Sequence, residues 1–205
     1  MIIAVDGPTA SGKGTIARGL AKHFSLPHLD TGLLYRAVGY QVRLTGGDPD
    51  NPLDAASAVN FPDSLLNEPL LRTEAVGALA SRVSVHKRVR AALLARQRIF
   101  AAQQGGAVLD GRDIGTVVAP DADIKLFVTA SLAARAARRL HECRTRGEDA
   151  ALPDITADVA RRDERDRHRS EAPLIQAADA VLLDTTHVTA EEALAQAIHI
   201  VGQRA

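Results

Sequence analysis

A glycine-rich segment near the start of the sequence constrains the fold more than any other feature. Residues 7–15 read GPTASGKGT and match the pattern G-x-x-x-x-G-K. The segment follows Met1–Val5, a short apolar run typical of a strand buried on both faces. It precedes residues 12–24, in which apolar side chains recur every four positions, as on one face of a helix. A strand, a glycine-rich turn and a helix in this order predict a phosphate-binding loop.

The chemistry of that loop follows from its residue types. Glycines let the backbone curl so that successive N–H groups point at phosphate oxygens, and the helix N-terminus adds partial positive charge. Lys13 supplies a full charge for the β- and γ-phosphates. Gly14 stands where the general motif has Ser or Thr, which leaves Thr15 as the nearest hydroxyl for a magnesium ion. The ion would then be held mainly by phosphate oxygens and water. The alternative, a glycine-rich turn with an incidental lysine, is disfavoured by the strand–helix context.

The remainder of the chain alternates between strand-like and helix-like segments. Strands are predicted at 27–30, 107–109, 124–128 and 180–183, and helices at 32–44, 72–84, 86–103, 131–146, 155–169 and 190–201. Residues 46–71 contain four prolines and are predicted to be loop. In the 131–146 helix we expect Leu132, Ala136 and Leu140 to face inward and Arg135, Arg138 and Arg139 to lie on the opposite side. Alternation of this kind predicts an α/β fold with a parallel sheet covered on both faces, and ligands bound beyond the carboxyl ends of its strands.

Composition excludes several classes of protein. With 46% hydrophobic residues over 205 positions, the chain is too apolar to be disordered and can bury the core of one domain. A single cysteine, Cys143, excludes a disulfide framework, and the seven histidines lack the spacing of a zinc site. No apolar run approaches the ~18 residues of a membrane span, and the N-terminus has no basic region, so we expect a cytoplasmic protein. A net charge of zero argues against a nucleic-acid or membrane partner.

Arginine is far more frequent than lysine in this chain, since 21 of the 25 basic residues are arginine. One interpretation is codon bias; the other is that guanidinium groups are used to bind phosphate in a bidentate manner. Ten of the arginines lie between Arg135 and Arg169, interleaved with eight acidic residues. That distribution favours a locally cationic cleft within a balanced surface.

Two segments at predicted strand ends are candidate binding loops. Asp30–Arg36 places a hydroxyl, Thr31, and an arginine within one helical turn, although taken alone the segment is better explained by Asp30 or Thr31 as the N-cap of an ordinary helix. Asp110–Thr116 carries charged residues flanked by glycines, and the alternative for it is a solvated turn. Asp110 is the acid expected near magnesium, because it ends a buried strand.

The 155–169 helix is a third candidate. Arg162, Asp166 and Arg169 share one helical face, and Arg165 lies on a neighbouring face. The alternative is a solvated helix with exposed ion pairs.

Taken together, these segments resemble the bacterial-type cytidylate kinases, a family of the nucleoside monophosphate kinase group. The resemblance runs from end to end of the chain. It is carried by Gly7–Thr15, LDTGLLYR at 29–36, RTEAVGALAS at 72–81, VRAALLARQ at 89–97, DGRDIGTVV at 110–118, Pro120–Ala122, RDERDRHRSEAPL at 162–174 and AADAVLLDT at 177–185. A phosphate loop alone indicates only a nucleotide, whereas this combination is highly specific.

The resemblance implies a three-layer P-loop kinase fold with a five-stranded parallel sheet, and transfer of the ATP γ-phosphoryl group to CMP or dCMP with Mg²⁺. It implies one kinase domain over 1–205, with a core at 1–36, 86–143 and 172–205. An acceptor-binding subdomain would cover about 37–85, and a helical lid about 144–171. Only 35 residues separate Arg36 from Arg72, where the family often has a longer insertion, so we expect a shortened acceptor-binding part. A monomer is expected.

The resemblance also assigns roles to individual residues. ATP would be held by Gly7, Pro8, Thr9, Ala10, Ser11, Gly12, Lys13, Gly14 and Thr15 together with Arg138 and Arg139. CMP would be held by Thr31, Tyr35, Arg36, Ser81, Arg90, Arg112, Asp113, Arg162, Asp166 and Arg169. The catalytic residues would be Lys13, Arg112, Arg165 and Arg169, with Arg165 folding over the ATP phosphates, and Thr15 and Asp110 would lie nearest Mg²⁺.

Base recognition has a physical rationale in that assignment. A carboxylate at Asp113 can accept a hydrogen bond from the 4-amino group of cytosine, whereas uracil presents an acceptor there. Two alternatives stay open at this stage: another small-molecule kinase with the same fold, and a nucleotide-binding switch without catalysis.

Overall fold

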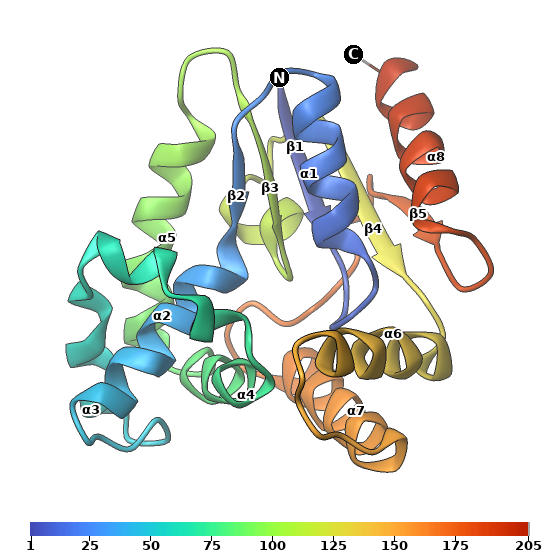
Figure 1. The fold of residues 1–205 in the computed structure, drawn as a ribbon. Coiled ribbons are helices and arrows are strands. Elements are labelled where there is room, and N and C mark those ends of the chain that lie inside the picture. Colours follow the sequence, from blue (N-terminus) through green and yellow to red (C-terminus); the bar gives the residue numbers. More distant parts are fainter. Residues whose placement is uncertain (205) are drawn as a thin grey trace.

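A parallel β-sheet forms the centre of the molecule in the computed structural model, which describes residues 1–204 (Figure 1). Its strands are β1 (Ile2–Asp6), β2 (His28–Asp30), β3 (Ala107–Gly111), β4 (Ile124–Thr129) and β5 (Val181–Asp184). They lie in the order β2-β3-β1-β4-β5, and every neighbouring pair is parallel. The predicted five-stranded parallel sheet is therefore confirmed. In this order the ends of β1, β2 and β3 are neighbours, which brings the three predicted binding loops together.

Helices connect the strands. They are α1 (Lys13–His23), α2 (Thr31–Leu44), α3 (Pro52–Ser57), α4 (Glu74–Val83), α5 (Lys87–Ala101), α6 (Leu132–Thr145), α7 (Leu152–His168) and α8 (Ala190–Gly202). Short turns of 3₁₀-helix occupy η1 (Ala58–Asn60), η2 (Asp63–Asn67) and η3 (Pro69–Arg72), and one π-helical turn, η4 (Ile114–Val118), follows β3. Within residues 1–204, none of the helices has the length and apolarity needed to cross a bilayer.

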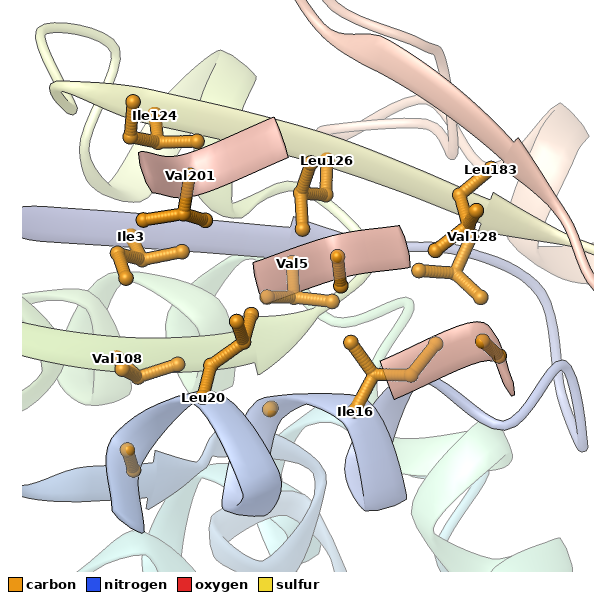
Figure 2. Packing of buried hydrophobic residues seen from close by; sticks show 14 residues of the cluster. Ile3, Val5, Ile16, Leu20, Val108, Ile124, Leu126, Val128, Leu183 and Val201 are labelled. Atoms are coloured by element: carbon orange, nitrogen blue, oxygen red, sulfur yellow. The ribbon is translucent and has the colours of Figure 1, made fainter. Parts of the chain in front are cut away.

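The main hydrophobic core lies between the sheet and two helices. Figure 2 shows Val5 and Leu126 from the central strands packed with Leu20 of α1 and Val201 of α8. Each of these side chains is essentially inaccessible to solvent. The continuous apolar run of β1 is explained by a second cluster on the other side of the sheet, where Ala4 packs with residues of β3 and η4. Burial on both faces fixes the position of the loop that follows β1.

Helix α5 lies alongside the sheet and packs on β3 and η4, whereas α2, α3, α4, α6 and α7 gather at the end of the sheet toward which the strands point (Figure 1). There α2, α3 and α4 build a separate apolar cluster with the 3₁₀ turns, while α6 and α7 pack on one another. These two helical groups flank the carboxyl ends of the strands.

Three expectations about local structure were wrong. Residues 46–71, expected to be loop, contain α3 and three 3₁₀ turns, because Pro52 and Pro69 occupy first-turn positions where a missing N–H costs nothing. For the same reason α7 begins at Leu152, with Pro153 in its first turn. In α6 Leu132 is exposed, because the phosphate loop and α7 cover the neighbouring side of that helix instead.

Candidate active site

The predicted phosphate-binding loop connects β1 to α1. A Cβ atom at Gly7 would lie 2.0 Å from the Val128 carbonyl oxygen in β4, so no side chain fits there. Gly12, immediately before α1, has a φ of 89°, in the left-handed region that glycine adopts without strain. The Lys13 ammonium group donates to the Pro8 carbonyl at 3.3 Å and thus folds back across the loop. The buried Ser11 hydroxyl has no hydrogen-bond partner among residues 1–204, which leaves a polar atom available in the loop.

A cavity of about 250 Å³ opens where the loops after β1, β2 and β3 meet. Most of the predicted site residues line it: Thr9, Ala10, Ser11, Gly12, Lys13, Gly14, Thr15, Thr31, Tyr35, Arg36, Ser81, Arg90, Asp110, Arg112, Asp113, Arg139, Arg162, Asp166 and Arg169. Gly7, Pro8, Arg138 and Arg165 do not line it. The structure therefore brings segments of the chain that are more than 100 residues apart into one cavity.

Arg112 is held at the edge of the phosphate loop from two sides. Its Nε donates to Asp166 at 2.7 Å, and its Nη2 donates to the Thr9 hydroxyl at 2.9 Å. Burial lowers the pKa of Arg112, but the carboxylates of Asp166, Asp163 and Asp110 together outweigh it and the net pKa is raised. Arg169 approaches the same carboxylate at 3.9 Å and donates to the Ala172 carbonyl at 2.7 Å. Two guanidinium groups thus converge on one side of the cavity, balanced by a carboxylate on α7.

Asp113 forms a second cluster with arginines. Arg90 donates to one of its oxygens at 2.5 Å, and Arg169 approaches the other at 3.5 Å. The Arg90 guanidinium also lies over the Tyr35 ring, 5.6 Å from its centroid, and burial raises the pKa of that phenol. Both Arg90 and Asp113 are buried. A carboxylate fixed in this way has a defined direction, as a residue that reads a base edge requires.

The helices α6 and α7 are tied to the rest of the molecule by ion pairs. Glu74, in the first turn of α4, accepts from Arg139 of α6 and, at 2.8 Å, from Arg162 of α7. Burial raises the pKa of Glu74, but the two arginines hold the net pKa below its usual value. Arg135 pairs with Asp163 at 2.7 Å and donates to the Thr9 carbonyl at 3.1 Å. The predicted outward position of Arg135 and Arg139 is therefore wrong: both are buried, because they join α6 to its neighbours.

Two predicted ATP contacts lie away from the cavity. Arg138 donates to the Thr185 hydroxyl at 2.9 Å, and that hydroxyl in turn donates to the Ser11 carbonyl at 3.0 Å. Arg165 donates to the Ser81 hydroxyl at 2.6 Å. Arg138 is thus linked to the phosphate loop through Thr185, whereas Arg165 contacts Ser81, a residue predicted to bind CMP.

Burial shifts the ionisation of the groups around the loop. The pKa of Lys13 is lowered to about 7 by burial and by the nearby Arg112. The pKa of Arg36 falls to about 10 through burial and the charges of Arg162 and Arg139. A bound phosphate would stabilise the charged forms of Lys13 and Arg36, which burial and neighbouring cations destabilise. The cavity is therefore suited to bind polyanions.

The side chains predicted to lie near magnesium fit an ion held mostly by its nucleotide. Thr15 and Asp110 both line the cavity. One oxygen of Asp110 contacts His28 Nε2 at 2.7 Å, and the other lies 3.6 Å from where a Cβ of Gly14 would be. Residues 1–204 hold no group of three or more metal-ligating His, Cys, Asp or Glu side chains. Such a sparse donor set suits Mg²⁺, which keeps waters and takes phosphate oxygens.

Sequence reasoning gave no role to three residues that organise the site, Asp6, His28 and Glu74, and it placed a fourth, Arg135, on the wrong side of its helix. Asp6 left a signal, since it is an acid that ends an apolar strand next to the phosphate loop. His28 directly precedes a predicted binding segment but has no motif of its own. Glu74 and Arg135 form pairs whose partners are distant in sequence, and nothing local reveals them.

The fold and the cavity define a phosphate-loop enzyme of the nucleotide kinase class. The family model described as Cytidylate kinase matches residues 3–203. Among curated relatives, the cytidylate kinase of Xanthobacter autotrophicus is 54% identical over 100% of this chain and 98% of its own length. That of Granulibacter bethesdensis is 56% identical over the same shares. The chain belongs to the cytidylate kinase family.

Solved structures support the fold. A crystal structure of an uncharacterized protein from Eubacterium ventriosum superposes with a TM-score of 0.61 at 14% identity, covering 100% of this chain and 99% of that one. At that identity the likeness concerns the fold alone.

Proposed function

We propose that this protein transfers the γ-phosphoryl group of ATP to CMP or dCMP, giving ADP and CDP or dCDP. The observation that carries the proposal is a single cavity lined both by the phosphate loop and by Asp113, whose carboxylate is fixed by Arg90. Membership of the cytidylate kinase family supports the same reaction. A cavity with both features can hold a donor phosphate and read an acceptor base.

On the donor side, residues Gly7–Thr15 would bind the ATP phosphates. Lys13 would place its charge against the β- and γ-phosphates, and bound Mg²⁺ would supply further charge neutralisation. Thr15 and Asp110 are the residues proposed to hold the hydrated ion. Arg138 and Arg139 would complete the ATP site, for which they must exchange their present partners, Thr185 and Glu74, for phosphate.

On the acceptor side, Arg36, Arg112 and Arg169 would hold the CMP phosphate, with Thr31 and Tyr35 beside it. The chain then has little covalent chemistry to perform, because the transferring group needs in-line positioning and cations around its equatorial oxygens. Arg112 is well placed for this role, since it already touches both the loop and α7. Arg165 would join it at the transferring phosphate after leaving Ser81.

The nucleoside would be read by a different set of side chains. Asp113 would accept from the 4-amino group of cytosine, with Ser81 and Arg90 completing the base site, and Arg162 and Asp166 would bind the ribose. Uracil would place an acceptor against Asp113, a buried polar mismatch that enzymes reject strongly.

These roles divide the chain into three working parts. The core at 1–36, 86–143 and 172–205 would hold ATP and most of CMP. The subdomain at about 37–85 would contribute Ser81 to the CMP site, and the lid at about 144–171 would close over both nucleotides. Closure excludes water, which would otherwise hydrolyse ATP.

The experiment is a coupled ADP-release assay with ATP and Mg²⁺ over all nucleoside monophosphates. We expect rapid turnover of CMP and dCMP and poor turnover of UMP and AMP. Equal turnover of UMP and CMP would contradict the role of Asp113. ATP binding without turnover in the presence of CMP would contradict the proposed reaction as a whole.

A further inference from the structure

Asp6 joins two loops of the site that are distant in sequence. It is the last residue of β1, immediately before the phosphate loop, and is buried with 5% of its surface exposed. One carboxylate oxygen accepts the backbone N–H of Ile114 at 2.8 Å, and the other accepts that of Gly115 at 2.8 Å. Both oxygens of a single side chain are thus used to hold the backbone that follows Asp113.

That backbone determines where Asp113 points. The N–H of Ile114 belongs to the same planar peptide unit as the Asp113 carbonyl, so fixing one fixes the other. The two bonds also hold the first residues of the π-helical turn η4, an irregular element of a kind that is rare and often found at functional sites. The position of the base-reading carboxylate relative to the phosphate loop therefore depends on Asp6.

The ionised state of Asp6 is costly for the folded protein. Burial raises its pKa to about 6 despite the two backbone donors; Asp113 adds to the shift, and Lys13 opposes it. Because the folded-state pKa lies above the unfolded value, the stabilising contribution of this group is complete only at low pH and is lost as the pH rises through 6.

We propose that Asp6 is a positioning residue for base recognition, which holds the Asp113 segment in register with the phosphate loop through the N–H groups of Ile114 and Gly115. The inference rests on the proposed CMP kinase activity. Asp6 contacts neither substrate in this view and acts only through the backbone of residues 113–115.

The test is Asp6→Asn in the full-length protein. An amide has one acceptor and one donor group, so it can accept only one of the two N–H groups and turns its NH₂ toward the other. We expect the KM for CMP to rise about tenfold, and the preference in kcat/KM for CMP over UMP to fall by a similar factor. ATP affinity, measured by calorimetry, and the melting temperature should stay close to the wild-type values.

Asp123→Asn is the matched control. Its carboxylate also accepts a backbone N–H of β1, that of Ile2 at 2.7 Å, but at the opposite end of the strand. It should leave the CMP to UMP preference unchanged. If Asp6→Asn does not fold, Asp6→Ser, whose hydroxyl can accept one of the N–H groups, takes its place with the same expected result.

An unchanged KM for CMP in the Asp6 variants would overturn the proposal. So would a parallel loss of ATP affinity, CMP affinity and melting temperature, because that pattern indicates a merely structural residue. Failure of the proposed function is seen separately, since the wild-type protein itself would then not phosphorylate CMP.

Discussion

Individual arginines in the cavity are paired with carboxylates of the protein itself. Arg112 and Arg169 both face Asp166, and Arg90 faces Asp113. Since a buried guanidinium without an anion is strongly destabilising, these carboxylates keep the cations in place before substrate binds. Burial raises the pKa of Asp166, but the adjacent arginines outweigh it and keep the net pKa low, so it remains an anion at neutral pH.

Arg169→Ala tests whether this arrangement serves catalysis. We expect kcat/KM to fall by about 10²–10³ because a cation at the transferring phosphate is lost. The fold should persist, since Arg90 and Arg112 remain to neutralise Asp113 and Asp166. Steady-state kinetics combined with thermal unfolding measure the two effects.

Arg167→Ala is the matched control for that variant, because Arg167 is exposed on the same helix two residues away. It should retain wild-type kinetics. If Arg169→Ala instead unfolds while Arg167→Ala does not, Arg169 is a structural ion-pair residue.

Lys13 provides a prediction about pH. Its pKa of about 7 without nucleotide means that much of it is uncharged at pH 8. Polyphosphate favours the ammonium form and raises the pKa, so ATP binding should take up close to one proton at pH 8, and ATP affinity should fall as the pH rises above 7. Calorimetry in two buffers of different ionisation enthalpy measures that uptake.

Lys13→Met should abolish the uptake, whereas Lys22→Met, at an exposed position at the end of α1, should retain it. Binding at pH 8 with no proton uptake in the wild type would show that Lys13 is already charged.

At the scale of elements, the sequence predicted the sheet well because its signals are local. Apolar runs such as Ile124–Thr129 can be recognised without knowing their neighbours, and the glycines of the phosphate loop occur at fixed spacing. The packing of α6 could not be predicted in this way. Whether Arg135 faces solvent or Asp163 depends on where α7 packs, and a helical period alone does not contain that information.

The contacts of Glu74 likewise depend on packing that no local pattern reveals. Glu74 links α4 both to α6 and to α7, the helix of the proposed lid. Its pairs with Arg139 and Arg162 are formed between residues 65 and 88 positions apart. Without substrate, this one carboxylate pairs with Arg139, proposed to bind ATP, and with Arg162, proposed to bind the ribose of CMP. We therefore expect the proposed lid to be ordered before ATP and CMP arrive.

Glu74→Gln should loosen the lid in the absence of nucleotide. Removing the carboxylate leaves Arg36, Arg139 and Arg162 close together without their shared anion, so amide hydrogen exchange in residues 152–168 should accelerate by about tenfold. Adding CMP with a non-hydrolysable ATP analogue should restore protection, because the substrate phosphates then neutralise Arg36 and Arg139 and the ribose of CMP contacts Arg162. Exchange measured by mass spectrometry follows both states.

Glu142→Gln is the control, since Glu142 pairs with Arg139 from within α6 and does not connect two elements. Equal exchange in wild type and Glu74→Gln would show that apolar packing alone holds α7.

The whole molecule has no net charge, yet its cationic side chains are concentrated around one cavity. Lys13, Arg36, Arg90, Arg112, Arg139, Arg162 and Arg169 all line it. An excess of cations confined to one cavity favours the binding of small polyanions that fit inside it. The excess of arginine over lysine, ambiguous in the sequence, is at this scale explained in part by the cavity.

Ionic strength should therefore affect nucleotide binding although the protein is neutral. Raising the salt from about 0.02 M to about 0.3 M shortens the distance over which charges act, so kcat/KM for both ATP and CMP should fall several-fold, with kcat changing less. Cytidine, which has the base and ribose of CMP but no phosphate, is the matched ligand, and its affinity should be nearly independent of salt. Initial rates for the nucleotides and calorimetry for cytidine measure the contrast. An equal salt dependence for CMP and cytidine would show that the arginines of the cavity are neutralised by their own carboxylates and add no attraction for phosphate.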